Sequence, residues 1–506
     1  MSTIDAGTDR TTTEPDPADV AELADSVLMP CFDGVSAPEW ILRRTARSLG
    51  GVCLFARNIG TPQQVRALTD SLRAQRHDIV IAIDEEAGDV TRLDAATGSR
   101  FPGPAAIGRA DDVNLTDEIG YQVGNLLRDA GITLNFAPSA DVAVDRTNPV
   151  IGTRSFGHDP ALVARHTAAF IRGHQAAGVH ACVKHFPGHG DTDADSHLSV
   201  AVVGTDLPGL AAVAFPPFRS AIAEGVAAVM AGHLVVPAVD DLPATLSHRW
   251  LTGILRGAMG FHGVVVTDAL EMAAIAGTHG IGAGAVRALS AGADLLCLGG
   301  EDAGEQMLDQ VAGAIVAAVL DGSLELARLQ DAAVRVRSLA EPTTRQQRPV
   351  DADAGNRAAT AALSISGALP PLVSPVLVLR CDADQSLAVG RVPWGLAAAS
   401  AATNPPAPAD PVLREIGLRS GDPLPQPEID AAATIVVLTR DRHRHRWMDE
   451  VVADVRARRR SAVVVEMGNG ELDGVPEPAM ASFGASAANG RAVLSALSLV
   501  ADRSQS

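Results

Sequence analysis

Short apolar runs separated by amphipathic stretches mark the first three hundred residues of the chain. Eight such runs, rich in β-branched side chains, occupy residues 26–32, 51–55, 79–84, 132–138, 181–186, 227–233, 263–269 and 293–299. They are continuously apolar rather than alternating, which is typical of parallel strands buried on both faces. The pattern therefore predicts eight buried parallel strands.

Helical patterns lie between most of these runs. Residues 61–75 begin with a Thr-Pro pair suited to a helix start, and Val65, Leu68 and Leu72 then form one apolar stripe. Eight strands alternating with helices predict an α/β fold of the (β/α)₈ TIM-barrel type. A doubly wound open sheet is the alternative, but no GxGxxG follows an early strand, which weakens a dinucleotide-binding version of it.

Polar side chains follow several of the predicted strands at the point where each ends. They are Asp84, Asn135, Lys184, His185, His233 and Asp268. In a barrel the carboxyl ends of the strands converge on one face, and that face carries the active site. Ordinary loop polarity explains one or two such residues, but explains Lys184 beside His185 less well. The sequence therefore predicts a single pocket.

The pattern of apolar and polar residues changes after about residue 340. A polar, Pro-containing stretch precedes three apolar runs at 375–380, 434–440 and 461–468 and a final helical pattern at 487–501. The predicted organisation is a mobile tail (1–20), a catalytic barrel (21–345), a linker (346–372) and a smaller C-terminal α/β domain (373–506). The basic, histidine-rich run 440–447 is interpreted as solvated surface.

Composition excludes several classes of protein. The 506 residues, 47% of them apolar, suit one large and one smaller core, and a net charge of −19 argues against nucleic-acid or anionic-membrane partners. The five cysteines are far apart and form no CxxC pair, and Cys53, Cys182 and Cys297 are expected to be small core residues. The start of the chain has no signal-peptide pattern, and no run reaches the roughly twenty apolar residues of a membrane span, so a cytoplasmic location is expected.

The stretch from Val183 to His197 has the highest density of titratable groups. His185, His189 and His197 are candidates for a metal site. However, Pro187 and the glycines around it exclude a regular helix, so the histidines share no common face. This metal-dependent alternative is therefore the less favoured one.

Acid–base chemistry is the other interpretation of this stretch. Asp195 lies two residues before His197, and a carboxylate beside an imidazole orients it and favours its protonated form. Such a pair can donate a proton near neutral pH. Taken alone, a loop with solvated charges explains the pair better.

Other carboxylates and arginines are candidates for chemistry or binding. Asp268 ends the seventh apolar run, where it can attack an electrophilic carbon or simply cap the following helix. Asp84 and Arg92 follow the third run and are plausible hydroxyl binders. Arg154 is a further candidate, for which a surface salt bridge is the alternative.

Several segments carry a resemblance to a known family. KHFPGHGDTDADSH, NFAPSADV, NPVIGTRSFG, DEEAGDV, PATLS and VVVTDALEM resemble glycoside hydrolase family 3, in its β-N-acetylglucosaminidase branch, over roughly residues 25–340. The resemblance implies that Asp268 is the nucleophile, His197 the general acid/base and Asp195 its orienting partner. It implies that the hydroxyl groups of the sugar are bound by Asp84, Arg154, Lys184 and His185. It also implies that the loop is shaped by His189 and Asp191.

One position departs from the family pattern. Ala87, Gly88 and Asp89 stand where the family often has Gly-Gly-Arg, so Arg92 is considered as a substitute sugar contact. The resemblance implies a retaining exo-β-N-acetylglucosaminidase that acts by double displacement through a covalent glycosyl-aspartate, with no metal or cofactor. Its expected substrates are N-acetylglucosamine-terminated glycans such as muropeptide fragments of peptidoglycan, and its expected state is a monomer or loose dimer.

Three alternatives to this function stay open. The first is a β-glucosidase or β-xylosidase of the same family. The second is an N-acetylglucosaminide phosphorylase, because a neutral imidazole repels phosphate less than a carboxylate does. The third is a non-catalytic glycan-binding protein.

Overall fold

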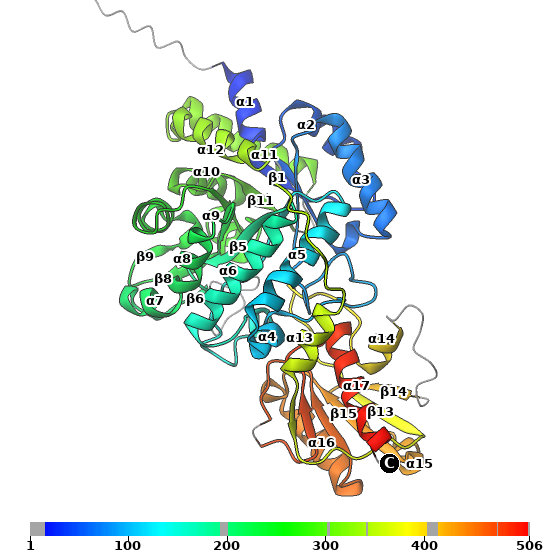
Figure 1. Cartoon of the computed structure of the whole chain (residues 1–506). Coiled ribbons are helices and arrows are strands. Elements are labelled where there is room, and N and C mark those ends of the chain that lie inside the picture. The colour runs from blue at the N-terminus through cyan, green and yellow to red at the C-terminus, as the bar shows by residue number, and fades with distance from the viewer. Residues whose placement is uncertain are drawn as a thin grey trace, which may run out of the picture.

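The computed structural model describes residues 16–192, 201–300, 304–340, 343–401, 413–472 and 474–503. The chain folds into a barrel and a smaller α/β domain packed against one end of it (Figure 1). No helix in these described ranges is both long and apolar enough to cross a bilayer.

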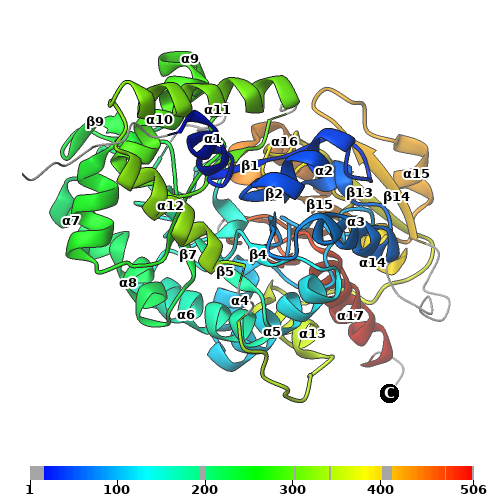
Figure 2. The ribbon, with the colours of Figure 1, turned by 90° about the horizontal axis from the view of Figure 1, so that it is seen from above.

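The larger unit is a (β/α)₈ barrel, as predicted. Its strands are β1 (Leu28–Pro30), β2 (Gly51–Leu54), β3 (Val80–Ile83), β4 (Leu134–Asn135), β5 (His180–Phe186), β7 (Ala228–Ala231), β10 (Val264–Thr267) and β11 (Leu296–Leu298). Six of them pair in parallel in the order β10-β7-β5-β4-β3-β2, and β1 pairs in parallel with β11. A parallel bridge from Val266 to Leu295 and the contact of β1 with β2 complete the ring, which excludes the open sheet (Figure 2).

Helices before, between and after the strands form the outer layer of the barrel. They are α1 (Pro17–Asp25), α2 (Glu39–Arg47), α3 (Pro62–Gln75), α4 (Pro104–Ala110), α5 (Val113–Asp129), α6 (Pro160–Ala176), α7 (Leu207–Val213), α8 (Phe215–Ala223), the π-helix η4 (Arg249–Ala258), α9 (Ala273–His279), α10 (Ile281–Ala291), α11 (Glu305–Leu320) and α12 (Leu326–Ser338). The start of α3 is as predicted, because the Thr61 side chain accepts a hydrogen bond from the backbone N–H of Gln64.

The strands are apolar throughout because each has two buried faces. In β3, Val80 and Ala82 belong to the cluster inside the barrel, whereas Ile81 and Ile83 belong to the cluster between strands and helices. Successive side chains of a strand point to opposite faces, and here both faces are apolar. Cys53, Cys182 and Cys297 belong to the inner cluster, which confirms them as small core residues, and all five cysteines are free and buried.

A small sheet in the segments after β5 and β7 was not predicted. Its strands are β6 (Ala201–Val202), β8 (Leu234–Val236) and β9 (Asp240–Pro243). They are too short for a periodic pattern to be recognised.

The second domain is a six-stranded sheet in the order β12-β17-β16-β15-β13-β14, parallel except for β12. Its strands are β12 (Ser364–Ser366), β13 (Val376–Cys381), β14 (Leu413–Leu418), β15 (Thr434–Thr439), β16 (Val463–Glu466) and β17 (Ala479–Ala481). Side chains of α15 (Gln426–Ala431) and α16 (Arg446–Arg458) pack on one face, and those of α14 (Leu396–Ala401) and α17 (Ala487–Arg503) pack on the other.

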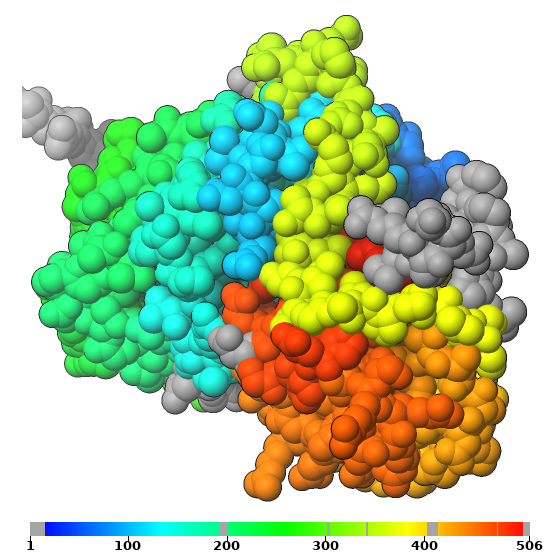
Figure 3. Space-filling view, turned by 60° about the horizontal axis from the view of Figure 1, so that its bottom comes forward, coloured from blue at the N-terminus to red at the C-terminus, as the bar shows by residue number. Residues whose placement is uncertain are grey.

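The region expected to be a linker is tied to both domains. Tyr121 in α5 donates a hydrogen bond to the Gln346 carbonyl at 2.8 Å, and Arg348 pairs with Asp117 at 2.6 Å. Helix α13 (Ala354–Ala362) then packs on α4, α5 and α17. Figure 3 shows the yellow-green chain running across the barrel helices into the second domain.

Two of the three predicted boundaries differ in detail from the secondary structure. The range 346–372 contains α13 and β12, and the strand belongs to the second sheet. At the other end, α1 begins at Pro17 with Asp16 as its N-cap, so residues 17–20 of the expected tail are helical.

Candidate active site

An irregularity in β5 aims two neighbouring side chains at the same region. The pairing of β5 with β7 shifts register between Val183 and Phe186, which brackets Lys184 and His185. In a regular strand consecutive side chains point to opposite faces, and a bulge removes that restriction. Both side chains can therefore contact groups at the carboxyl end of the barrel.

Lys184 belongs to a buried network of four charged groups. Its Nζ lies 2.5 Å from Asp84 Oδ1 and 2.6 Å from Glu86 Oε1, in the loop after β3. Glu86 also accepts two hydrogen bonds from the guanidinium of Arg154, at 2.9 and 2.7 Å. Three of these side chains are at most 5% exposed and Asp84 is 18% exposed, so Asp84 reaches furthest toward solvent.

Pairing keeps these groups charged in spite of their burial. Burial alone would raise the pKa of Glu86, but Arg154 and Lys184 outweigh it and hold that pKa well below its ordinary value. Burial likewise opposes the ammonium of Lys184, yet Asp84 and Glu86 raise its pKa. The network thus presents fixed charges that can bind the hydroxyl groups of a sugar.

His185 joins this network to a third carboxylate, that of Asp141. Its Nδ1 lies 2.7 Å from Asp141 Oδ2, and its Nε2 lies 3.3 Å from Nη2 of Arg154. Because the carboxylate accepts and the guanidinium donates, Nδ1 carries the hydrogen and Nε2 accepts. Asp141 Oδ1 also accepts from the backbone N–H of His189 at 2.6 Å, so this carboxylate fixes the start of the loop that leads to His197.

Asp268 directly follows β10 and is half-buried. Its backbone N–H donates to the Ala231 carbonyl at 3.0 Å, and its Oδ1 accepts from the Ala269 N–H at 2.9 Å. His233 follows β7, and its Nε2 lies 2.9 Å from the Ala269 carbonyl. The carboxylate is thus held at the carboxyl end of two neighbouring strands.

Electrostatics link Asp268 to the network on β3 and β5. Burial raises the pKa of the Cys182 thiol, and the charges of Lys184, Asp84 and Asp268 all act on it. Asp84, Lys184 and Asp268 also lie at the carboxyl ends of β3, β5 and β10, which run in parallel within one sheet. The structure therefore brings these three predicted site residues to one mouth of the barrel, together with Arg154 and His185.

Two predicted catalytic residues, Asp195 and His197, lie outside the described residues. Their roles stay predictions, as does a metal site that includes His197. Among the residues that the structure does describe, no three His, Cys, Asp or Glu side chains are grouped so that they could hold a metal ion.

Arg92 is not brought into the charged network. Its guanidinium donates to the Ala388 carbonyl of the second domain at 2.9 Å, and its backbone N–H donates to Glu85 Oε2. The side chain of Arg92 thus makes a contact between the two domains. None of its contacts in the structure supports the predicted binding of sugar hydroxyl groups.

Sequence reasoning missed Glu86 and Asp141 as members of the site. Both lie in segments already singled out, DEEAGDV and NFAPSADV, but nothing in the sequence separates a pairing carboxylate from a solvated one. Asn135 has a supporting role, since its side chain accepts from the Glu85 N–H and donates to the Glu85 carbonyl, both at 2.9 Å. It therefore holds the backbone of the loop that carries Asp84 and Glu86.

Glu85 is the buried carboxyl group of this loop that is not ion-paired. It is 1% exposed, and its Oε2 accepts from the backbone N–H groups of Arg92 and Leu93 at 2.9 and 3.0 Å. Burial raises its pKa from 4.5 to about 7 in spite of these bonds. The folded protein therefore retains a proton that the unfolded chain releases.

This difference predicts a pH-dependent stability. Because the folded state binds the proton more tightly, the contribution of Glu85 to the free energy of unfolding should fall by about 3 kcal/mol as pH rises from about 4.5 to 7. In Glu85→Gln that titration is absent. As pH rises from 5 to 8, the urea-unfolding midpoint of the wild type should therefore fall relative to that of the variant. Glu325→Gln, at an exposed position, is the control. Parallel pH profiles for wild type and Glu85→Gln would contradict the prediction.

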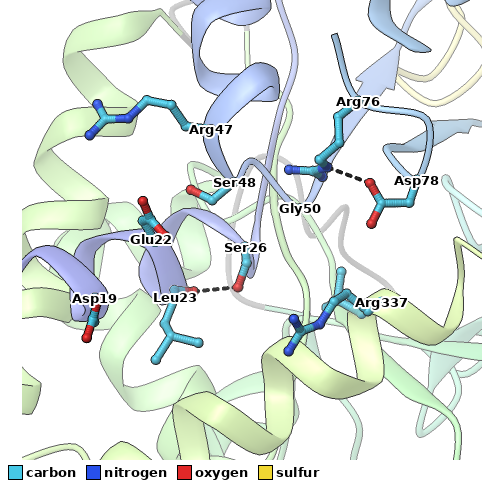
Figure 4. A pocket seen from close by; sticks show the side chains of 11 residues that line it. Asp19, Glu22, Leu23, Ser26, Arg47, Ser48, Gly50, Arg76, Asp78 and Arg337 are labelled. Atoms are coloured by element: carbon cyan, nitrogen blue, oxygen red, sulfur yellow. Dashed lines mark hydrogen bonds and ion pairs between the residues drawn. The ribbon is translucent and has the colours of Figure 1, made fainter. Parts of the chain in front are cut away.

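A separate hollow of about 390 Å³ lies at the opposite end of the barrel. It is lined by groups that precede the amino ends of β1, β2 and β3, with mixed charges from Asp19, Glu22, Asp78, Arg47, Arg76 and Arg337 (Figure 4). It contains none of the candidate residues, and this face of a barrel serves stability rather than chemistry.

Comparisons with known proteins agree with this geometry. Residues 36–339 match the family described as "Glycosyl hydrolase family 3 N terminal domain". A Pseudomonas aeruginosa protein named "Beta-hexosaminidase" is 41% identical over 253 residues, which make up 49% of this chain and 74% of that protein.

Two solved structures are similar to this one. A glycoside hydrolase family 3 β-N-acetylglucosaminidase from Paenibacillus sp. str. FPU-7 is 30% identical with a TM-score of 0.84, over 95% of this chain and 96% of that chain. A β-N-acetylhexosaminidase from Beutenbergia cavernae is 28% identical with a TM-score of 0.58, over 63% of this chain and 98% of that chain. The first therefore matches both domains.

Proposed function

The chain belongs to glycosyl hydrolase family 3, and from this premise we propose that it is a retaining exo-β-N-acetylglucosaminidase. The observation that carries the proposal is the buried network of Asp84, Glu86, Lys184 and Arg154 at the same barrel mouth as Asp268. Fixed charges suit the hydroxyl groups of a terminal sugar, and a carboxylate nearby suits attack on its anomeric carbon. The names of the similar proteins support N-acetylglucosamine as that sugar.

The reaction has two displacements. Asp268 attacks the anomeric carbon while His197, oriented by Asp195, gives a proton to the departing oxygen. The resulting glycosyl ester is then attacked by water, whose proton His197 takes, and the carboxylate of Asp268 leaves. Each displacement inverts the anomeric centre, so the sugar is released as the β-anomer.

Selectivity and stereochemistry test this proposal together. We expect 4-nitrophenyl N-acetyl-β-glucosaminide to have a kcat/KM at least about a hundredfold above that of the β-glucoside or β-xyloside, because a site that binds the acetamido group rejects sugars without it. An NMR time course should show the β-anomer first. Preference for the glucoside or xyloside would point to the other activities of the family, and the α-anomer as first product would rule out retention.

Two additions to the same assay separate further alternatives. Acceleration by phosphate with formation of a sugar 1-phosphate would make the enzyme a phosphorylase. Loss of activity with a chelator would favour the metal-dependent alternative.

The physiological substrates that we propose are N-acetylglucosamine-terminated fragments of peptidoglycan. This rests on the family resemblance of the loop from Lys184 to His197. Mass spectrometry of muropeptides incubated with the enzyme should show loss of one terminal N-acetylglucosamine, and unchanged muropeptides would restrict the proposal to other β-linked glycans.

A further inference from the structure

The carboxylate of Asp89 lies at the junction of the two domains. It is 6% exposed and belongs to the loop after β3 that also carries Asp84 and Glu86. Its Oδ2 accepts from Thr153 Oγ1 at 2.7 Å and from Nη2 of Arg440 at 2.9 Å. Its Oδ1 accepts from the backbone N–H of Ala485 at 2.9 Å. One carboxylate thus joins two barrel loops to two segments of the second domain.

The partner of Asp89 is itself well anchored. Arg440 directly follows β15, its side chain is 13% exposed, and its guanidinium lies 5.9 Å from the centre of the Trp394 ring. The run 440–447 was expected to be solvated surface, but at Arg440 it is part of the domain junction. A buried ion pair of this kind has little freedom to move unless both partners move.

The loop that carries Asp89 has little room to shift. Gly88 has a φ of +64°, and a side-chain carbon at this position would lie 2.2 Å from the Gly103 Cα. The path of residues 84–89 is therefore fixed at Gly88 by close packing and at Asp89 by the second domain.

Both loops that Asp89 joins carry candidate sugar-binding groups. Thr153 precedes Arg154, and Asp89 lies three residues after Glu86. Glu86 and Arg154 form the two-point ion pair of the network. On the basis of the hydrolase function proposed above, we propose that Asp89 and Arg440 are a positioning pair through which the second domain holds Glu86 and Arg154 in their substrate-binding geometry.

This role differs from catalysis, because the Asp89 carboxylate is occupied by its hydrogen bonds with Thr153, Arg440 and Ala485. Some contacts to a substrate are as strong in the ground state as in the transition state. Loss of such contacts weakens substrate binding but does not slow the chemical step. The pair should therefore act mainly on KM.

The test is a comparison of kcat and KM for Asp89→Asn, Arg440→Met, Arg440→Lys and the double variant Asp89→Asn/Arg440→Met. The substrate is whichever 4-nitrophenyl β-glycoside the wild type hydrolyses best. Asp89→Asn and Arg440→Met are expected to raise KM about tenfold to a hundredfold with kcat within about threefold, and the double variant should be no worse than the worse single one. Arg440→Lys should recover part of the loss.

Two control variants separate positioning from general effects. Arg446→Gln lies in the same basic run and is 93% exposed, so its KM should be that of the wild type. His443→Ala removes a different domain contact, from His443 Nε2 to the Arg146 carbonyl at 2.8 Å, and should lower the melting temperature without raising KM.

Several outcomes would overturn the inference. They are unchanged KM in Asp89→Asn and Arg440→Met, a loss confined to kcat, additive losses in the double variant, or an equal rise of KM in His443→Ala. Should the wild type prefer a sugar other than the acetamido one, the proposed function fails, but the comparison still tests the positioning pair on the preferred substrate.

Discussion

Replacing Asp268 with alanine is expected to lower kcat for 4-nitrophenyl N-acetyl-β-glucosaminide by about 10³-fold or more, because no nucleophile remains to form the covalent intermediate. The half-buried carboxylate lies in the loop after β10, at the mouth of the barrel and not in its apolar core, and its Oδ1 accepts a hydrogen bond from the backbone N–H of Ala269. The fold should therefore survive the change. Stopped-flow and steady-state release of nitrophenol measure the loss.

A small anion can identify the role of Asp268. Azide can occupy the space left by the carboxylate and attack from the same side, which would give the α-glycosyl azide. In His197→Ala, azide would instead attack the glycosyl-aspartate and give the β-azide. Asp241→Ala, which replaces an exposed carboxylate on β9, should keep wild-type turnover. Activity of Asp268→Ala within tenfold of wild type, or a β-azide from it, would remove Asp268 from the nucleophile's role.

Replacing Glu86 with glutamine is expected to lower the free energy of unfolding by about 3–5 kcal/mol, because Lys184 and Arg154 then lose the carboxylate charge that offsets their burial. Glutamine has the same shape and can accept only part of the hydrogen bonds from the two cations. Urea unfolding at pH 7 measures the change. Substrate affinity should fall as well, since both cations belong to the proposed sugar-binding network.

The pH dependence of this effect has a definite sign. Because the pKa of Glu86 is lowered on folding, its stabilisation is present above the unfolded pKa of about 4.5 and is lost as pH falls below it. The difference between wild type and Glu86→Gln should therefore shrink in acid. Glu39→Gln removes an exposed pair with Arg43, whose atoms are 3.9 Å apart, and should cost no more than about 0.5 kcal/mol. An equal, small cost for both variants would show that the buried network contributes little.

The barrel could be predicted from the sequence because its strands have two apolar faces. Residues 79–83, for example, are apolar without a break, and buried parallel strands combine that feature with intervening helices. Short strands without such runs, such as β8 and β17, could not be predicted. Their stability comes from pairing with distant strands rather than from local pattern.

The candidate site was predictable in part. Asp84, Lys184, His185 and Asp268 were singled out because they stand at the ends of apolar runs, and the structure places them at the carboxyl ends of the barrel strands, while their roles stay predictions. Glu86 was missed because its partner Arg154 lies 68 residues away, and only the fold brings the two together. Arg92 was assigned to the pocket because it follows the same strand as Asp84, but side chains in a loop have no period that fixes their direction.

Helix α13 has a consequence for how such enzymes can be recombined. Alanine side chains line both of its contacts, with Ala105 and Ala106 of α4 against Ala362, and with Ala488 and Ala492 of α17 against Ala359. Contacts between such small side chains leave no space for bulkier residues. A chimera that joined this barrel to a foreign second domain would therefore need to take α13 and α17 from the same parent, with small side chains on α13 that match Ala105 and Ala106 of α4. The natural crossover point lies before residue 354 rather than at the sheet of the second domain.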